Sequence, residues 1–235
     1  MIRIGVFGAN GRMGLALLEA ATIKEQTQLT GAYVRSGSSL IGVNVNQVNS
    51  AADKNVCFSD ENTLESVDVL IDFTLPEGMR NHLKHAVEQS LPLVIGTTGL
   101  TTDDMALLEN AAKHIPIVFA RNYSVGVNVL LNLVKTAATK FGDDLDIEIF
   151  EAHHRHKIDA PSGTALAIGE SIADAKGWNH EEVAVYDRSQ VETEKSQNEI
   201  GYSVLRGGDI VGEHTAYFAT MGERLELTHK ASSRM

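Results

Sequence analysis

The chain has 235 residues and a formal net charge of −11, with 20 Lys and Arg against 31 Asp and Glu. That length fits one large domain or two modest ones, and the acidic balance disfavours generic binding to nucleic acid or to an anionic membrane. The single cysteine, Cys57, excludes an internal disulfide, and no apolar run is long enough to predict a membrane span. We therefore expect a soluble cytoplasmic protein.

The first half of the sequence alternates short apolar runs with helical patterns. Strands are predicted at Ile2–Phe7, Gln28–Val34, Val67–Phe73, Leu93–Ile95 and Ile115–Phe119. Helices are predicted directly after the first strand, over Gly78–Gln89, and over Thr102–His114 behind a Thr101–Asp104 cap. This alternation predicts an α/β fold over residues 1–123, in the form of a Rossmann-like, doubly wound dinucleotide-binding domain.

The pattern changes after Asn122, and residues 124–235 predict a second, α+β domain. The predicted helices run from Val127 to Ala138, with Gly142 ending the first, and from Thr164 to Ala175. Strands are predicted at Asp146–Phe150 and, as antiparallel strands, at Ile200–Leu205, Ile210–Thr220 and Arg224–His229. We expect one mixed sheet with helices on one face, and a mobile loop at Thr193–Glu199.

A glycine-rich turn follows the first predicted strand, with Gly8, Gly11 and Gly14 at its corners and Arg12 beside them. Such a turn lets the backbone approach a pyrophosphate, and the following helix N-terminus supplies N–H donors and positive partial charge. Asn10 stands where the common fingerprint has its second glycine, and Asn tolerates left-handed dihedrals. A purely structural turn is the alternative, but the place after an N-terminal strand favours dinucleotide binding.

The ends of later predicted strands carry further candidates. NAD-selective sites usually place an acid after the second strand, whereas this chain has Val34 and Arg35 there. Arg35 suits a 2′-phosphate and favours NADP(H), with an unliganded surface arginine as the alternative. Gly96–Gly99 and Ala120–Tyr123 follow two other strands, at the sheet edge where ligands of open α/β sheets bind.

Titratable and charged side chains are concentrated in residues 151–157, which have the sequence Glu-Ala-His-His-Arg-His-Lys. A solvated basic run is one interpretation. A zinc site is a second, although the interleaved Arg155 and Lys157 would repel the cation; its ligands would be His153, His154 and His156.

The third interpretation is an anion-binding catalytic loop, with a histidine that titrates near neutrality and a lysine as acid or charge stabiliser. Ser162, Gly163 and Thr164 then open a helix whose amides and hydroxyls suit a carboxylate. We favour this interpretation, which predicts a small dianionic substrate facing a nicotinamide ring.

Three motifs, Gly8–Gly14, Glu151–Lys157 and Asp159–Ala165, resemble those of the dihydrodipicolinate reductase family, also called 4-hydroxy-tetrahydrodipicolinate reductases. Further segments with the same resemblance are Ile71–Thr74, Gly96–Gly99, Asn122–Asn128 and Gly208–Thr215. The resemblance covers essentially the whole chain. It implies an NAD(P)H-dependent reductase of lysine and diaminopimelate biosynthesis, acting on a cyclic imine with loss of water.

The resemblance also implies roles for individual residues. The pyrophosphate would be held by Gly8, Ala9, Asn10, Gly11, Arg12 and Met13, and the nicotinamide side lined by Gly96, Thr97, Thr98, Ala120, Arg121, Asn122 and Tyr123. His153 would be the proton donor and acceptor, and Lys157 the second donor. The substrate carboxylates would be bound by His154, Gly163 and Thr164. No metal is implied.

The sequence departs from the family pattern at two places. Members often carry an acid where Val34 stands, so NADPH is favoured over NADH. Members also typically continue beyond Met235, in a segment that returns to the cofactor domain. The resemblance further implies a homotetramer built through the sheet of the second domain. Two other functions stay open, a non-catalytic NADP(H)-binding protein and another dehydrogenase acting on a sugar or semialdehyde.

Single residues outside these motifs favour structural roles. Cys57 lacks an adjacent histidine and is expected to be an inert buried thiol. His214 and His229 lie on predicted strands, where polar side chains usually find local partners.

Overall fold

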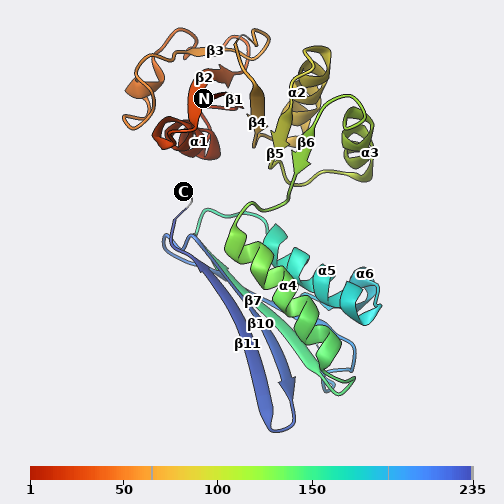
Figure 1. Cartoon of the computed structure of the whole chain (residues 1–235). Coiled ribbons are helices and arrows are strands. Elements are labelled where there is room, and N and C mark those ends of the chain that lie inside the picture. Colours follow the sequence, from red (N-terminus) through yellow and green to blue (C-terminus); the bar gives the residue numbers. More distant parts are fainter. Residues whose placement is uncertain (65, 190, 234–235) are drawn as a thin grey trace. The chain divides into compact units, whose positions relative to one another are not determined.

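The computed structural model describes residues 1–64, 66–189 and 191–233, and the chain forms two compact units, Met1–Arg121 and Asn122–Arg234 (Figure 1). Each unit has its own sheet. None of the described helices is long and apolar enough to cross a membrane.

The sheet of the first unit has six parallel strands in the order β3-β2-β1-β4-β5-β6. Its strands are β1 (Ile2–Phe7), β2 (Thr27–Val34), β3 (Phe58–Asp60), β4 (Val69–Asp72), β5 (Leu93–Ile95) and β6 (Ile117–Phe119). Its helices are α1 (Arg12–Ile23), α2 (Pro76–Glu88) and α3 (Thr102–Ala111), with a 3-10 turn at Val45–Gln47. The predicted doubly wound α/β fold is confirmed.

Two apolar cores lie on the two faces of this sheet. Adjacent residues of a strand point to opposite faces, so Val6 packs with Leu18 of α1, whereas Phe7 packs with Met79 of α2. The strand order reverses between β1 and β4, and ligands of doubly wound sheets bind at such a reversal, outside the carboxyl ends of the strands.

Several boundaries differ from the sequence prediction. Strand β3 was not predicted, because three residues carry too little periodicity to be recognised. It pairs with β2 and sets Asp60 opposite Val34. Cys57 is exposed rather than buried, since it precedes β3 and pairs only with Asn44, through an isolated bridge. The predicted cap of α3 is confirmed, with the Thr101 side chain accepting from the Asp104 N–H.

The second unit holds a five-stranded mixed sheet in the order β11-β10-β7-β9-β8. Its strands are β7 (Asp146–His153), β8 (Ala184–Val185), β9 (Ile200–Arg206), β10 (Gly212–Thr220) and β11 (Glu223–Ala231). Its helices are α4 (Val125–Lys140), α5 (Gly163–Lys176) and the short α6 (His180–Val183). Figure 1 shows α4 and α5 on one face of the sheet, where Val134 and Ile168 share a core with Ile147 and Phe218.

The mixed sheet is confirmed, but the neighbours of one strand differ from the prediction. Strand β9 runs opposite to β10, as predicted, but it lies between β7 and β8 and pairs in parallel with both. The chain crosses back through α5 after β7, as a parallel pair requires. Strands β10 and β11 are antiparallel, as predicted. Helix α4 ends at Lys140 with an extended cap residue, Phe141, so Gly142 does not cap it. In the loop before β9, Lys195 donates to the carbonyl of Ile147.

Candidate active site

The glycine turn after β1 has the shape that a pyrophosphate requires. Gly8 has φ +59°, and its carbonyl accepts from the N–H of Gly11 at 2.9 Å. A Cβ on Gly14 would overlap that same carbonyl, so α1 can pass this close only with glycine there. Asn10 is not in the left-handed region, so the expected reason for an asparagine there was wrong. Gly8 alone supplies that conformation in the turn.

The first turn of α1 is open to an anion. Its cap residue, Gly11, makes no side-chain capping bond, and the turn contains no acidic residue. The first residue of the helix, Arg12, is exposed. Uncapped N–H groups at a helix N-terminus with a cation beside them fit the pyrophosphate of a nicotinamide dinucleotide.

The other predicted cofactor residues of the first unit follow strands β2, β5 and β6. Arg35 is exposed one residue after β2, and the acid nearest in register, Asp60 of β3, accepts from Ser36 at 2.9 Å. Gly96, Thr97 and Thr98 follow β5, and Thr97 is buried with its hydroxyl toward Asp72. Ala120 and Arg121 follow β6. The turn after β1 and these segments share one edge of the sheet, because all six strands are parallel.

Asn122 and Tyr123 belong to the second unit. The Asn122 side chain donates to Thr164 Oγ1 at 3.1 Å, so the structure groups it with the predicted substrate residues. Its own Oδ1 accepts from the N–H of Ser124 and thereby holds the entry to α4.

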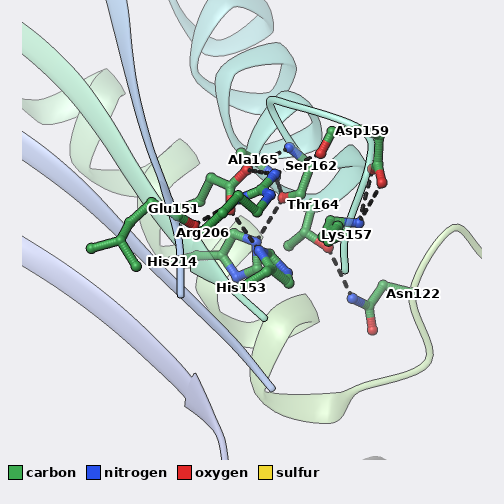
Figure 2. Close-up of polar contacts among 11 residues, drawn as sticks. Asn122, Glu151, His153, Lys157, Asp159, Ser162, Thr164, Ala165, Arg206 and His214 are labelled. Atoms are coloured by element: carbon green, nitrogen blue, oxygen red, sulfur yellow. Dashed lines mark hydrogen bonds and ion pairs between the residues drawn. The ribbon is translucent and has the colours of Figure 1, made fainter. Parts of the chain in front are cut away.

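His153 is the last residue of β7 and is buried, with its Nδ1 2.6 Å from Glu151 Oε2 (Figure 2). A carboxylate only accepts hydrogen bonds, so Nδ1 carries a proton and Nε2 is the nitrogen left available for proton exchange. Among the described residues, Nε2 makes no hydrogen bond. A Cβ on Gly212 would stand 3.1 Å from it, so glycine at that position keeps one side of the ring clear.

Glu151 gathers four donors in a fully buried position. Besides His153, it accepts from Arg206 Nη1 at 2.7 Å and Nη2 at 2.8 Å, and from the N–H of Ser162 at 2.9 Å. Burial acts to raise the pKa of this carboxyl, but the bonds from His153, Arg206 and Ser162 together lower it to about 2. Glu151 therefore stays ionised and holds the His153 ring in one tautomer.

Neither Glu151 nor Arg206 was among the site residues predicted from the sequence. A signal for Glu151 was present, because residues two apart on a strand share a face. Arg206 gave none, since it reaches the site through the parallel register of β9, which sets it opposite His153.

His214 packs beside this pair. Its Nε2 lies 2.9 Å from Ser162 Oγ, and its ring meets the His153 ring edge-on, with 5.1 Å between centroids. Burial, followed by the nearby charge of His153, lowers the pKa of His214 to about 4. His214 is therefore neutral near pH 7. His229 lies elsewhere, with Nε2 3.5 Å from Ser124 Oγ.

Lys157 lies in the turn that follows His153, and its Nζ donates to the two carboxylate oxygens of Asp159 at 2.9 and 2.8 Å. Burial acts to raise the pKa of Asp159, but the Lys157 ammonium outweighs that effect and lowers it. This ion pair holds a cation at the surface of the loop, where an anionic ligand can compete for it.

The N-terminus of α5 completes the site. Ser162 caps it by accepting from the N–H of Ala165 at 3.2 Å, and the Gly163 position is exposed and open to solvent. The three loop histidines do not converge: His153 is paired with Glu151, and the His154 and His156 rings are 6.2 Å apart. In the described ranges, no group of three His, Cys, Asp or Glu residues is placed to hold a metal.

Comparison with protein families matches both units. The model "Dihydrodipicolinate reductase, N-terminus" matches residues 2–123, and the model "Dihydrodipicolinate reductase, C-terminus" matches residues 126–235. Together the two models span nearly the whole chain.

Individual proteins agree with these matches. A 4-hydroxy-tetrahydrodipicolinate reductase of Pseudoalteromonas translucida is 81% identical over 99% of this chain and 87% of its own length. A reductase of the same name from Pseudoalteromonas atlantica is 51% identical over 100% of this chain and 89% of its own length. The dipicolinate-bound dihydrodipicolinate reductase of Paenisporosarcina sp. TG-14 superposes with a TM-score of 0.71 at 26% identity, covering 100% of this chain and 89% of that one.

Proposed function

The chain belongs to the dihydrodipicolinate reductase family, and we propose that His153 and Lys157 are the proton donors of its reaction. It is an NAD(P)H-dependent reductase that converts 4-hydroxy-tetrahydrodipicolinate to tetrahydrodipicolinate with loss of water, in lysine and diaminopimelate biosynthesis. The buried pair of Glu151 and His153, 2.6 Å apart, is the observation that carries the assignment of proton transfer.

The nicotinamide coenzyme, when bound, supplies the hydride. The protein must then stabilise the negative charge that develops on the substrate ring and must deliver a proton to it. His153 does this from Nε2, because Glu151 fixes the proton on Nδ1 and Gly212 leaves Nε2 accessible. Arg206 balances the charge of Glu151, so the carboxylate orients the imidazole inside a neutralised cluster.

Lys157 and the start of α5 hold the substrate. A dianionic cyclic imine competes with Asp159 for the Lys157 ammonium, which brings a second proton donor to the ring. His154, the backbone N–H of Gly163 and the Thr164 hydroxyl bind the carboxylates, at the positive end of a 14-residue helix. The Asn122 side-chain amide donates a hydrogen bond to the Thr164 hydroxyl and thereby orients it.

The two predicted domains have different roles in this proposal. Residues 1–123 bind the coenzyme through Gly8–Met13, Gly96–Thr98 and Ala120–Tyr123, and residues 124–235 bind the substrate and assemble a homotetramer. The mixed sheet supports that assembly, because Leu205 exposes an apolar side chain on the face opposite the one that α4 and α5 cover. A cytoplasmic location fits the consumption of a nicotinamide coenzyme. Light scattering of the purified chain tests the tetramer.

The activity is tested by the loss of NADPH absorbance when freshly generated 4-hydroxy-tetrahydrodipicolinate is added. We expect substrate-dependent oxidation that pyridine-2,6-dicarboxylate inhibits competitively. Nucleotide binding without oxidation would favour the non-catalytic alternative. Oxidation that pyridine-2,6-dicarboxylate leaves unchanged would contradict the assignment of the carboxylate site.

NADPH is the preferred coenzyme in this proposal, because Arg35 and not an acid follows β2. Replacing Arg35 with Ala should raise the Kd for NADPH by about tenfold or more, the loss of one charge-assisted phosphate contact, and should leave the Kd for NADH within about twofold. The exposed Lys24→Ala variant is the matched control. Equal effects on the two coenzymes would mean that Arg35 does not reach the 2′-phosphate.

A further inference from the structure

A second buried imidazole lies in the first unit, outside the residues assigned above. His82 of α2 has 3% of its side chain exposed. Its Nδ1 is 2.6 Å from Asp72 Oδ2, and its Nε2 is 3.1 Å from Glu61 Oε2. The ring stacks on Phe7 with 3.9 Å between centroids and 5° between planes. The imidazole is thus held on both nitrogens and on one face.

The other oxygen of Asp72 holds two turns. Its Oδ1 accepts from the N–H of Thr74 at 2.7 Å, from the Thr74 hydroxyl at 2.7 Å and from the Thr97 hydroxyl at 3.2 Å. Asp72 itself is fully buried at the end of β4. One carboxylate therefore joins the segment that follows β4 to the segment that follows β5.

These two segments lie at the point where the strand order reverses. A Cβ on Gly8 would stand 2.6 Å from the Thr74 methyl group, so Thr74 lies directly against the glycine turn after β1. Thr97 belongs to the segment assigned to the nicotinamide side of the coenzyme. The Asp72 carboxylate consequently hydrogen-bonds to both of the segments that border the proposed coenzyme site.

The charges explain why a histidine stands at this position. A buried carboxylate below an anion-binding turn would repel a pyrophosphate unless a cation neutralised it. Burial of His82 acts against its protonation, but Asp72 and Glu61 outweigh burial and raise the pKa of the imidazole. The imidazolium offsets the negative charge and fixes the carboxylate in one orientation.

We propose that Asp72, clamped by His82, is a positioning residue for the coenzyme: it sets the Thr74 and Thr97 turns so that the nicotinamide dinucleotide fits between them. The inference rests on the proposed coenzyme site, and it adds a residue that needs no contact with the coenzyme. Loss of the clamp should weaken coenzyme binding more than it slows the chemical steps.

The test measures NADPH binding to the full chain by calorimetry without substrate, and kcat and KM in turnover. The Asp72→Asn variant should raise the NADPH Kd and KM by about tenfold or more, with kcat at saturating NADPH within about threefold. Asp104→Asn is the matched control, because Asp104 is an equally buried carboxylate of this unit that accepts from Thr101 and Arg80. It should lose stability without a change in Kd.

A milder pair of variants covers the case in which Asp72→Asn does not fold. Thr74→Val keeps the volume but removes the hydroxyl donor, and should raise the NADPH Kd several-fold, whereas Thr74→Ser keeps the donor and should bind nearly as the wild type. Equal Kd values for Thr74→Val and Thr74→Ser, or equal Kd shifts in Asp72→Asn and Asp104→Asn, would overturn the proposal. A wild-type chain that binds no NADPH would overturn the proposed function as well.

Discussion

The two units each contain a buried histidine whose Nδ1 lies 2.6 Å from a carboxylate, yet the two pairs are built for different tasks. In His82, the second nitrogen, Nε2, is hydrogen-bonded to Glu61, and one face of the ring stacks on Phe7. His153 keeps Nε2 beside the space that Gly212 leaves. We therefore propose that the pair with both nitrogens occupied holds a structure in place, and that the pair with one accessible nitrogen exchanges protons.

The difference should be largest in turnover. His153→Gln removes the proposed proton donor, and kcat should fall by roughly 10²- to 10⁴-fold with little change in the NADPH Kd. His82→Gln should instead raise the NADPH KM and keep most of kcat. Steady-state kinetics with both substrates varied separates the two results.

The exposed neighbour His156→Gln is the control for the charge of the loop, and should stay within about twofold of wild type. A His153→Gln variant with wild-type kcat would remove His153 from proton transfer. It would also end the functional contrast between the two histidines.

The next largest fall in kcat is expected from Glu151, the carboxylate that holds the His153 ring. Glu151→Gln keeps the shape but loses the charge that fixes the Nδ1 proton and pairs with Arg206, so kcat should fall on the order of 100-fold. Glu148→Gln, on the same strand and paired with Lys195, is the control and should keep its rate. Equal kcat values in these two variants would show that the bond to Glu151 does not orient His153.

Accessibility of Nε2 is tested by one methyl group. Gly212→Ala places a Cβ 3.1 Å from Nε2 of His153, so the ring must shift by a few tenths of an ångström. A misplacement of this kind should lower kcat about tenfold. Gly142→Ala, where nothing lies within 4 Å of the added Cβ, should have no effect on kcat. An unchanged kcat in Gly212→Ala would mean that the proton leaves by another path.

Local patterns revealed the parts of this molecule that lie close together in the sequence. The turn from Gly8 to Gly14 and the loop from His153 to Thr164 are continuous segments, so their residue types alone indicated anion binding. Arg206 reaches Glu151 only through the pairing of β7 with β9, and a pairing that depends on a long crossover cannot be predicted from alternation.

His82 illustrates the same limit in the first unit. Its partner Asp72 ends β4, whereas Glu61 follows β3, a strand too short to leave a periodic pattern. A histidine inside an amphipathic helix gives no sign in the sequence of the carboxylates that it will meet. Arg206 and the two partners of His82 therefore could not be identified until the strand order was known.

The smallest effect that we predict concerns stability, where the two pairs respond at opposite ends of the pH range. Glu151 has a pKa of about 2 in the folded chain against an ordinary 4.5, so its contribution is present above pH 4.5 and is lost as the pH falls. The folded-state pKa of His82 is raised above 6.5, so its contribution is present below pH 6.5 and is lost as the pH rises through the raised value.

Chemical denaturation of His82→Gln should show a free energy of unfolding about 1–3 kcal/mol below that of wild type at pH values under 6.5, and this deficit should shrink in alkaline buffer. The exposed His114→Gln should match wild type throughout. A deficit that stays constant with pH would mean that folding does not raise the pKa of the His82 imidazole, so that the bond to Asp72 does not favour the charged ring.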